Sequence, residues 1–146
     1  MSLRFFLDLA VVGGKQYSGA VNVSMLDARM ALEWIRDNIS RFGGDPGNVM
    51  LFGQSAGGGT VNTLLTMPSA KGLFHRAAVQ SGSNFRALSN EDATKTTETI
   101  LEKLKLKASQ LDELQTLPVD RILAAASGPG VRLGPVVDGG ILPEQP

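Results

Sequence analysis

The chain of 146 residues carries 14 lysines and arginines against 14 aspartates and glutamates, and this zero net charge argues against a polybasic nucleic-acid arm or membrane patch. It has no cysteine and a single histidine, which argues against disulfides, thiolate metal sites and histidine clusters. A hydrophobic fraction of 42% predicts a globular chain of about one domain.

The first third of the chain is predicted to hold one strand and one long helix. Residues 5–12 form an apolar run that favours a strand or the remnant of one, and Gly13-Gly14 ends it as a turn. Ser24 is expected to cap a helix over residues 25–40, which the turn residues of 43–48 then end. The helix follows from apolar residues at helical spacing, namely Leu26, Met30, Ala31, Trp34, Ile35 and Ile39.

The middle of the chain has the pattern of a βαβ unit. Residues 49–52 and 77–80 are short apolar runs bounded by turns, and the first is typical of a strand covered on both faces in a parallel sheet. Between them, a glycine-rich turn over residues 53–59 leads into a predicted helix at 60–65. The order strand, turn, helix, strand predicts a parallel pair with a right-handed crossover.

The last third of the chain is predicted to be helical and then irregular. Residues 91–106 are polar with apolar positions at helical spacing, and residues 111–117 and 119–126 form two short helices divided by Pro118. Residues 131–146 are rich in glycine and proline. No run in the sequence approaches the roughly 18 apolar residues that a membrane span needs.

The strongest chemical signal is Gly53-Gln54-Ser55-Ala56-Gly57, which matches G-x-S-x-G between a predicted strand and a predicted helix. In such a nucleophile elbow the serine has a strained backbone and its hydroxyl projects clear of the sheet, while Gly53 and Gly57 leave room on either side. The N–H of Ala56, at the helix N-terminus, would donate to a developing oxyanion. Ser55 is therefore the candidate nucleophile. The alternative is a glycine-rich turn whose serine has no chemical role.

The same residues overlap a second motif. Gly53 and Gly58 have the spacing of the phosphate loop G-x-x-x-x-G-K-[ST], and Thr60 stands at its hydroxyl position. Gly59 occupies the position of the lysine that contacts the β- and γ-phosphates, so the charge needed there is missing. A phosphate-binding module is therefore the less favoured alternative.

Together with its surroundings, the motif resembles the type-B carboxylesterase family of α/β-hydrolases, which includes para-nitrobenzyl esterases and cholinesterases. The resemblance covers most of the chain and weakens between residues 90 and 130. It is carried by stretches that follow the family's order, namely Asn22–Asp27, Ala31–Ile39, Phe42–Val49, Leu51–Gly57, Phe74–Ala77, Gln80–Ser83, Gly134–Gly139 and Leu142-Pro143.

The resemblance implies a partial α/β-hydrolase fold, with a mostly parallel sheet and flanking helices, and hydrolysis of carboxylic esters without a metal or an organic cofactor. It makes Ser55 the nucleophile, Ala56 one oxyanion donor, and Gly53 and Gly57 the glycines that support the elbow. The family's triad acid, triad base and His-Gly-Gly-Gly oxyanion loop match no residues of the sequence, so the chain is expected to be an internal fragment. We predict a single incomplete segment over residues 1–146, with a nucleophile-elbow core at 1–89, a helical segment at 90–130 and a Gly- and Pro-rich end at 131–146.

Two further residues invite a catalytic role. His75, the only histidine, precedes the second predicted strand, where the family has no base, so a structural or partly exposed imidazole is the favoured interpretation. Asp138 comes before the place of the family's acid and is expected to serve in packing or a turn.

The expected partner is a small-molecule carboxylic ester, with no nucleic acid and no membrane. Without a triad base, the isolated chain is expected to hydrolyse activated esters feebly or not at all. Unpaired strand edges predict self-association. A catalytically inactive fragment or interaction module of the same fold is the main alternative. The absence of cysteine is compatible with a cytoplasmic protein without requiring one.

Overall fold

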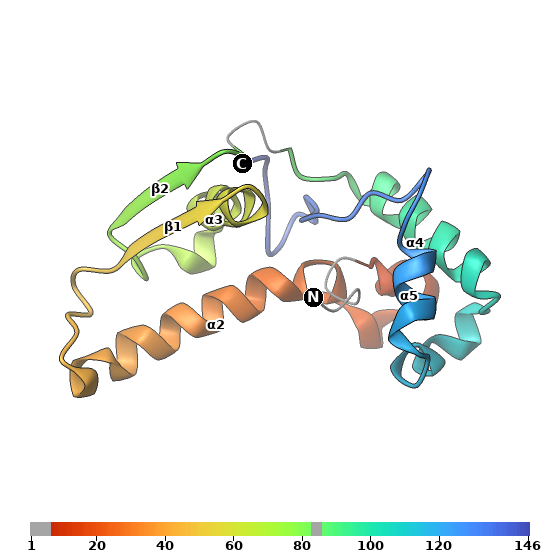
Figure 1. Cartoon of the computed structure of the whole chain (residues 1–146), viewed down its shortest axis with the longest axis horizontal. Coiled ribbons are helices and arrows are strands. Elements are labelled where there is room, and N and C mark those ends of the chain that lie inside the picture. The colour runs from red at the N-terminus through yellow and green to blue at the C-terminus, as the bar shows by residue number, and fades with distance from the viewer. Residues whose placement is uncertain (1–6, 83–85) are drawn as a thin grey trace. The chain divides into compact units, whose positions relative to one another are not determined.

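A computed structural model describes residues 7–82 and 86–146 of the chain (Figure 1). The chain forms two compact units. The helical unit consists of the chain up to Val23 together with Leu88–Val136, and the strand unit consists of Ser24–Ala87 together with Val137–Pro146. The predicted division into 1–89, 90–130 and 131–146 concerns segments of sequence rather than compact units, and it stays a prediction.

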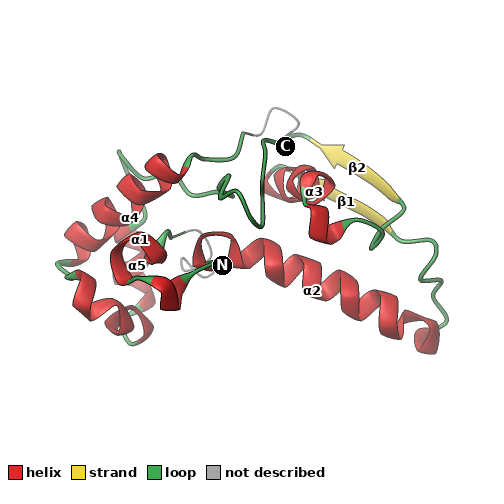
Figure 2. Ribbon diagram, turned by 180° about the vertical axis from the view of Figure 1, so that it is seen from behind, coloured by secondary structure: helices red, strands yellow, loops and turns green. Residues whose placement is uncertain are grey.

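The strand unit is built around a βαβ motif, as predicted. Strand β1 (Met50–Gln54) and strand β2 (Arg76–Gln80) pair in parallel, with Met50 opposite Arg76 and Gln54 opposite Gln80. Helix α3 (Ala56–Thr66) connects them and lies beside both strands in the two opposite views of Figures 1 and 2. Four glycine and alanine residues open this helix, so its backbone can approach the strands closely.

The long helix α2 (Val23–Asn38) supplies much of the core of the strand unit. Met25 and Leu32 are its buried residues, and they meet α3 and the segment that follows it. This apolar cluster drives the packing of the unit, because each fully buried aliphatic side chain contributes roughly 1.5–3 kcal/mol. Its buried members are Met25, Leu32, Leu64, Met67, Ala70, Leu73, Ala87 and Leu142.

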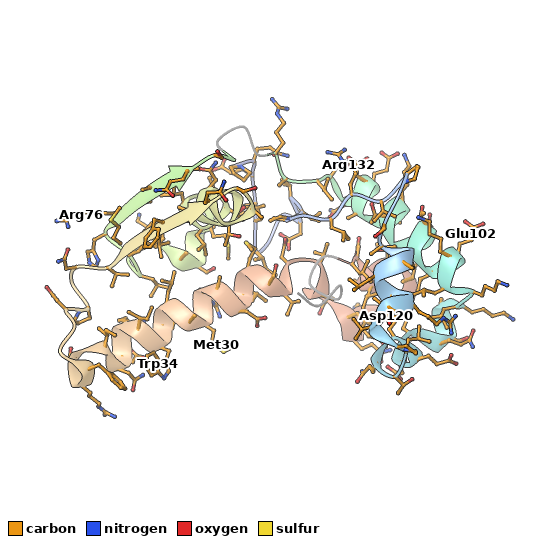
Figure 3. The ribbon with its side chains drawn as sticks, in the orientation of Figure 1. Met30, Trp34, Arg76, Glu102, Asp120 and Arg132 are labelled. Atoms are coloured by element: carbon orange, nitrogen blue, oxygen red, sulfur yellow. The ribbon has the colours of Figure 1, made fainter. Side chains whose placement is uncertain are left out.

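One detail of the predicted α2 is wrong. Ser24 does not cap the helix, because the chain enters α2 at Val23 directly from a 3-10 turn, and the Ser24 hydroxyl is buried with no hydrogen-bond partner among the described residues. Met30 and Trp34, which contributed to the helical pattern, are 60% and 52% exposed. Figure 3 shows both side chains on the side of α2 that faces away from the strands.

The prediction that the first strand is covered on both faces is also wrong for the described chain. Burial alternates along β1, with Leu51 and Gly53 partly covered and Met50, Phe52 and Gln54 exposed. Phe52 is 72% exposed and Met50 is 51% exposed. The apolar run reflects a strand with two apolar faces, and the described residues of the strand unit cover only one of them.

Among its described residues, the helical unit contains the helices α1 (Leu9–Gly13), α4 (Asn90–Leu104) and α5 (Val119–Ala125), with a 3-10 helix at Ala108–Gln115 (Figure 2). The helices predicted over the last third of the chain are thus confirmed, although the segment at 111–117 takes the 3-10 form. No helix within residues 7–82 and 86–146 is long and apolar enough to cross a membrane. The main cluster of this unit is Leu7, Leu9, Ile100, Leu101, Leu104, Leu111, Leu114 and Ala125.

The strand predicted at residues 5–12 is wrong where the structure describes it. Residues 5 and 6 lie outside the described part, and Leu9–Gly13 forms the short helix α1. Val11 and Val12 favour strands intrinsically, but burial of Leu9 in the helical cluster outweighs that preference. Gly14, at φ +83°, ends the helix as the predicted turn.

Polar contacts hold the helical unit together across long stretches of sequence. The fully buried side chain of Asn22 donates to the carbonyl of Val136 at 2.8 Å and accepts from its N–H at 3.0 Å. Leu88 forms a parallel bridge with the same residue. The side-chain amide of Asn22 therefore pairs with the backbone N–H and carbonyl of Val136, as a peptide group of a neighbouring strand would.

Helix α4 has defined ends. The Ser89 hydroxyl accepts the N–H of Asp92 at 3.1 Å, as an N-cap does. At the other end Lys105 adopts φ +59°, and its N–H bonds to the carbonyl of Glu102 at 2.9 Å. A lysine therefore occupies a left-handed C-terminal position that usually belongs to glycine.

Candidate active site

The candidate site lies where β1 ends and α3 begins, in the strand unit. Ser55 occupies this junction with φ +55° and ψ −116°, directly after Gln54 and directly before the first helical residue, Ala56. Ser55 is an exposed residue. The strand, the abrupt turn and the helix thus occur in the order that the pentapeptide predicts.

Two backbone hydrogen bonds force this conformation on Ser55. Its N–H donates to the carbonyl of Gln80 on β2 at 2.9 Å, which extends the ladder of the parallel pair by one residue. Its carbonyl accepts the N–H of Gly59 at 3.1 Å, which begins the helical pattern of α3. One residue therefore belongs to a strand and to a helix at once. A positive φ at a non-glycine residue costs about 1–3 kcal/mol, and these bonds help to offset it.

The glycines around the turn differ in how strictly the structure requires them. A Cβ on Gly53 would lie 2.3 Å from the carbonyl carbon and oxygen of Gly57, which no packing change can relieve cheaply. A Cβ on Gly58 would lie 2.1 Å from the carbonyl oxygen of Ser81. At Gly57 no described atom outside the backbone of its own helix comes within 4 Å. The steric requirement therefore falls on Gly53 and Gly58 more than on Gly57.

The segment that follows β2 forms a second wall of the turn, which sequence reasoning did not include in the site. Ser81 has φ +62° and Gly82 has φ +78°. A Cβ on Gly82 would lie 2.6 Å from the carbonyl oxygen of Ser55. The only sequence signal for this wall is a Ser-Gly pair at the end of a short apolar run, which resembles many ordinary turns.

The electrostatics of the junction favour negative charge near Ser55. The first N–H groups of a helix have no partner within the helix, and its dipole adds about half a positive charge at that end. Helix α3 has no acidic residue in its first turn to neutralise this potential. The Ser55 hydroxyl makes no capping bond to α3. The N–H of Ala56 and the hydroxyl of Ser55 are thus the groups at this junction that could take part in a reaction.

The structure places His75 and Asp138 in structural roles. The Nδ1 atom of the His75 ring accepts the N–H of Val49 at 3.2 Å, and the backbone N–H of His75 donates to the Val49 carbonyl at 2.8 Å. Val49 precedes β1, whereas Ser55 follows it, and a strand rises about 3.3 Å per residue, so the whole strand separates them. Asp138 accepts the N–H groups of Gly140 and Leu142 at 3.0 and 2.9 Å, as a turn carboxylate does.

Comparison with known proteins gives consistent matches. A profile described as the carboxylesterase family matches residues 10–146. The para-nitrobenzyl esterase of Bacillus subtilis is 41% identical over 134 residues, which cover 86% of this chain and 27% of that protein. Liver carboxylesterase 1 of Oryctolagus cuniculus is 47% identical over 87 residues, or 60% of this chain and 15% of that protein.

Solved structures agree with these matches. The carboxylesterase EST55 of Geobacillus stearothermophilus superposes with a TM-score of 0.87 at 44% identity, over 95% of this chain and 31% of that chain. A second neighbour, a para-nitrobenzyl esterase, gives a TM-score of 0.80 at 37% identity, over 97% of this chain and 31% of that chain. The expected α/β-hydrolase fold class is therefore confirmed. The chain spans less than a third of the length of these relatives, at 27% and 31%.

Proposed function

The chain belongs to the carboxylesterase family, and on that premise we propose that it carries the nucleophile of a carboxylic ester hydrolase, Ser55. The observation that carries the proposal is the position of Ser55, an exposed residue at a positive φ between the end of β1 and the N-terminus of α3. The esterase names of the relatives supply the substrate class, a small-molecule carboxylic ester.

The proposed chemistry proceeds in two steps. The Ser55 Oγ attacks the ester carbonyl carbon as its proton leaves to a base, and the N–H of Ala56 donates to the resulting oxyanion. The tetrahedral intermediate collapses, expels the alcohol and leaves the acyl group on Ser55. A water molecule then attacks this acyl-serine, and the carboxylic acid departs. Gly53, which has no Cβ, allows the sharp turn that orients Ser55 for the attack. Gly57 lies on the helical side of the same turn.

The base must come from a part of a family-length enzyme that these 146 residues do not supply. His75 does not serve, because its ring accepts the N–H of Val49 at the opposite end of β1. The isolated chain should therefore hydrolyse activated esters feebly or not at all. The proposal is therefore that the chain carries the nucleophile, and not that it performs a complete catalytic cycle by itself.

The phosphate-loop alternative gains no support from the local geometry. A phosphate loop needs several residues of open backbone whose N–H groups surround an anion. In this chain Ala56 begins α3 directly after Ser55, and Gly58 and Gly59 are buried within that helix. Residues 56–59 therefore form a helical turn rather than an anion-binding loop.

A hybrid enzyme tests the proposal. Residues 10–146 replace the matched segment of the Geobacillus stearothermophilus carboxylesterase, whose remaining chain supplies the other groups. The hybrid should hydrolyse p-nitrophenyl acetate, and Ser55→Ala should lower turnover about 10⁶-fold. Ser69→Ala, at an exposed serine of the same unit, serves as the control and should leave turnover within about twofold. Turnover that survives Ser55→Ala would refute the proposal.

Labelling with a fluorophosphonate separates the esterase from an inactive interaction module. Reaction requires Ser55 Oγ to attack phosphorus and displace fluoride, which needs a working base. The hybrid should be labelled at Ser55, and the isolated chain should not. A folded hybrid that takes up no label would favour the inactive module.

A further inference from the structure

The backbone of Ser55 rests against the turn that follows β2, as well as against its own helix. A Cβ on Gly82 would lie 2.6 Å from the Ser55 carbonyl oxygen and 3.1 Å from the Gly59 nitrogen, so the two backbones are in direct contact. The Ser55 N–H also donates to the Gln80 carbonyl. Any movement of residues 80–82 therefore changes the space that the Ser55 backbone occupies.

The turn at residues 80–82 is itself in a costly conformation. Ser81 has φ +62° although it carries a side chain, and Gly82 follows at φ +78°. Gly82 adopts its positive φ at no steric cost, but a residue with a side chain such as Ser81 keeps one only where surrounding contacts fix it. Gly58 contributes one such contact, because its missing Cβ would fall 2.1 Å from the Ser81 carbonyl oxygen.

A side-chain hydrogen bond provides a second contact on the same face of α3. The Asn62 amide donates to the Gly82 carbonyl at 3.2 Å. Asn62 lies four residues after Gly58, so both positions share the face of α3 that meets the turn. Gly58 lets the helix approach the turn, and Asn62 binds the turn to the helix.

We propose that Asn62 is a positioning residue for the nucleophile, which holds the turn at residues 80–82 against the Ser55 backbone and thereby fixes the direction of the Ser55 hydroxyl. The inference rests on the proposed function of Ser55. Asn62 itself touches no reacting atom, and its effect passes through the Gly82 carbonyl. A displaced turn would leave Ser55 chemically intact but wrongly oriented for attack, which lowers the rate of the chemical step.

Two variants separate the hydrogen bond from the packing of the side chain. Asn62→Asp keeps the shape of the side chain but replaces the donor with an acceptor that repels the Gly82 carbonyl, whereas Asn62→Ala removes both shape and donor. Asn38→Ala is the matched control, because the Asn38 amide also donates to a backbone carbonyl, that of Trp34 at 3.0 Å, within α2.

Hydrogen exchange on the 146-residue chain gives the first measurement. Both Asn62 variants should raise amide exchange in peptides covering residues 53–60 and 76–82 roughly fivefold, the value expected for loss of one hydrogen bond. Asn38→Ala should leave these peptides unchanged. Unchanged exchange in both Asn62 variants would overturn the inference without any assay of activity.

The hybrid esterase gives the second measurement. Asn62→Asp should lower kcat roughly fivefold to tenfold with KM unchanged, since orientation of the nucleophile and not substrate binding is affected. Asn38→Ala should match the unmodified hybrid in both constants. Unchanged kcat in Asn62→Asp, in a hybrid that Ser55→Ala inactivates, would overturn the positioning role alone. Turnover that survives Ser55→Ala would instead refute the proposed function.

Discussion

The helical unit and the strand unit differ in how completely they bury their apolar side chains. The helical unit gathers leucines and isoleucine from α1, α4 and the 3-10 helix into one cluster, and polar side chains join its distant segments. The strand unit covers one face of β1 only in part and leaves Phe52 and Met50 exposed on the other. A helix can satisfy its own backbone and bury one stripe, whereas a strand needs neighbours at its edges and on both faces.

The candidate site therefore lies in the unit whose apolar surface is less completely covered. The elbow needs only β1, β2, α3 and the turn after β2, all of which are contiguous in sequence. Its local geometry is therefore established within the strand unit, while the outer face of the same strands still presents apolar side chains.

The largest expected effect concerns the backbone contacts at the elbow. Gly53→Ala should destabilise the chain by about 3 kcal/mol or more, because its Cβ would collide with the Gly57 carbonyl at 2.3 Å. Gly57→Ala should change stability by no more than about 1 kcal/mol, since alanine favours helix and no described atom outside the helix backbone obstructs it. Urea unfolding followed by circular dichroism measures both. Equal losses would show that the elbow tolerates the two positions alike.

The next effect tests the polar link of the helical unit. Asn22→Ala should cost about 3 kcal/mol, because it leaves the buried N–H and carbonyl of Val136 without the amide that pairs with them. Asn38→Ala removes an exposed amide of the other unit and should cost no more than about 0.5 kcal/mol. The same urea titration compares them. A loss at Asn22 no larger than that at Asn38 would contradict the role given to this link.

Self-association tests the open face of the strand unit. Phe52→Ser should weaken association of the isolated chain about tenfold or more, because burial of a phenylalanine contributes roughly 1.5–3 kcal/mol. Val119→Ser, at a residue of the helical unit that is 67% exposed, should leave association unchanged. Sedimentation velocity over a range of concentrations gives the comparison. A monomeric starting chain, or equal effects of the two variants, would argue against the strand face as the site of association.

The smallest expected effect is a change in the pKa of Tyr17 in the helical unit. The Tyr17 hydroxyl donates to Asp112 at 3.0 Å, and this hydrogen bond together with the carboxylate charge raises the pKa of the phenol above its usual range. The small stability that the contact contributes is present below the usual tyrosine pKa and is lost as pH rises through the raised pKa. Asp112→Asn should lower the pKa of Tyr17, the only tyrosine, as followed by the ultraviolet absorbance of tyrosinate. An unshifted titration would show that the contact is not formed.

The sequence predicted the βαβ motif well because its signals are local. Apolar runs bounded by glycine mark β1 and β2, and the pentapeptide between β1 and α3 specifies a turn whose geometry depends on a few neighbouring residues. The pentapeptide predicts the positive φ of Ser55, and the hydrogen bond from the Ser55 N–H to the Gln80 carbonyl on β2 supports it. The interpretations of His75 and Asp138 came instead from the resemblance to the family, and the hydrogen bonds of both residues are consistent with them.

Features that depend on distant segments could not be predicted. Residues 9–13 form a helix because Leu9 joins a cluster from α4 and the 3-10 helix, which the sequence of α1 does not reveal. The pairing of Asn22 with Val136 joins residues 114 positions apart. The need for glycine at position 58 comes from Ser81, across the βαβ crossover. Pattern reasoning chose Gly57 instead, because motif spacing does not show which backbone approaches the helix.

Three residues with side chains have a left-handed backbone in the described chain, namely Ser55, Ser81 and Lys105. At Lys105 glycine would relieve strain at the end of α4 and should raise stability by about 1 kcal/mol without touching the elbow. Glycine at position 55 would relieve strain in the same way, but it would remove the hydroxyl on which the proposed chemistry depends. A directed-evolution campaign that selects the hybrid esterase for heat resistance and activity together should therefore accept glycine at position 105 and reject it at position 55, which would separate incidental backbone strain from strain that the proposed chemistry requires.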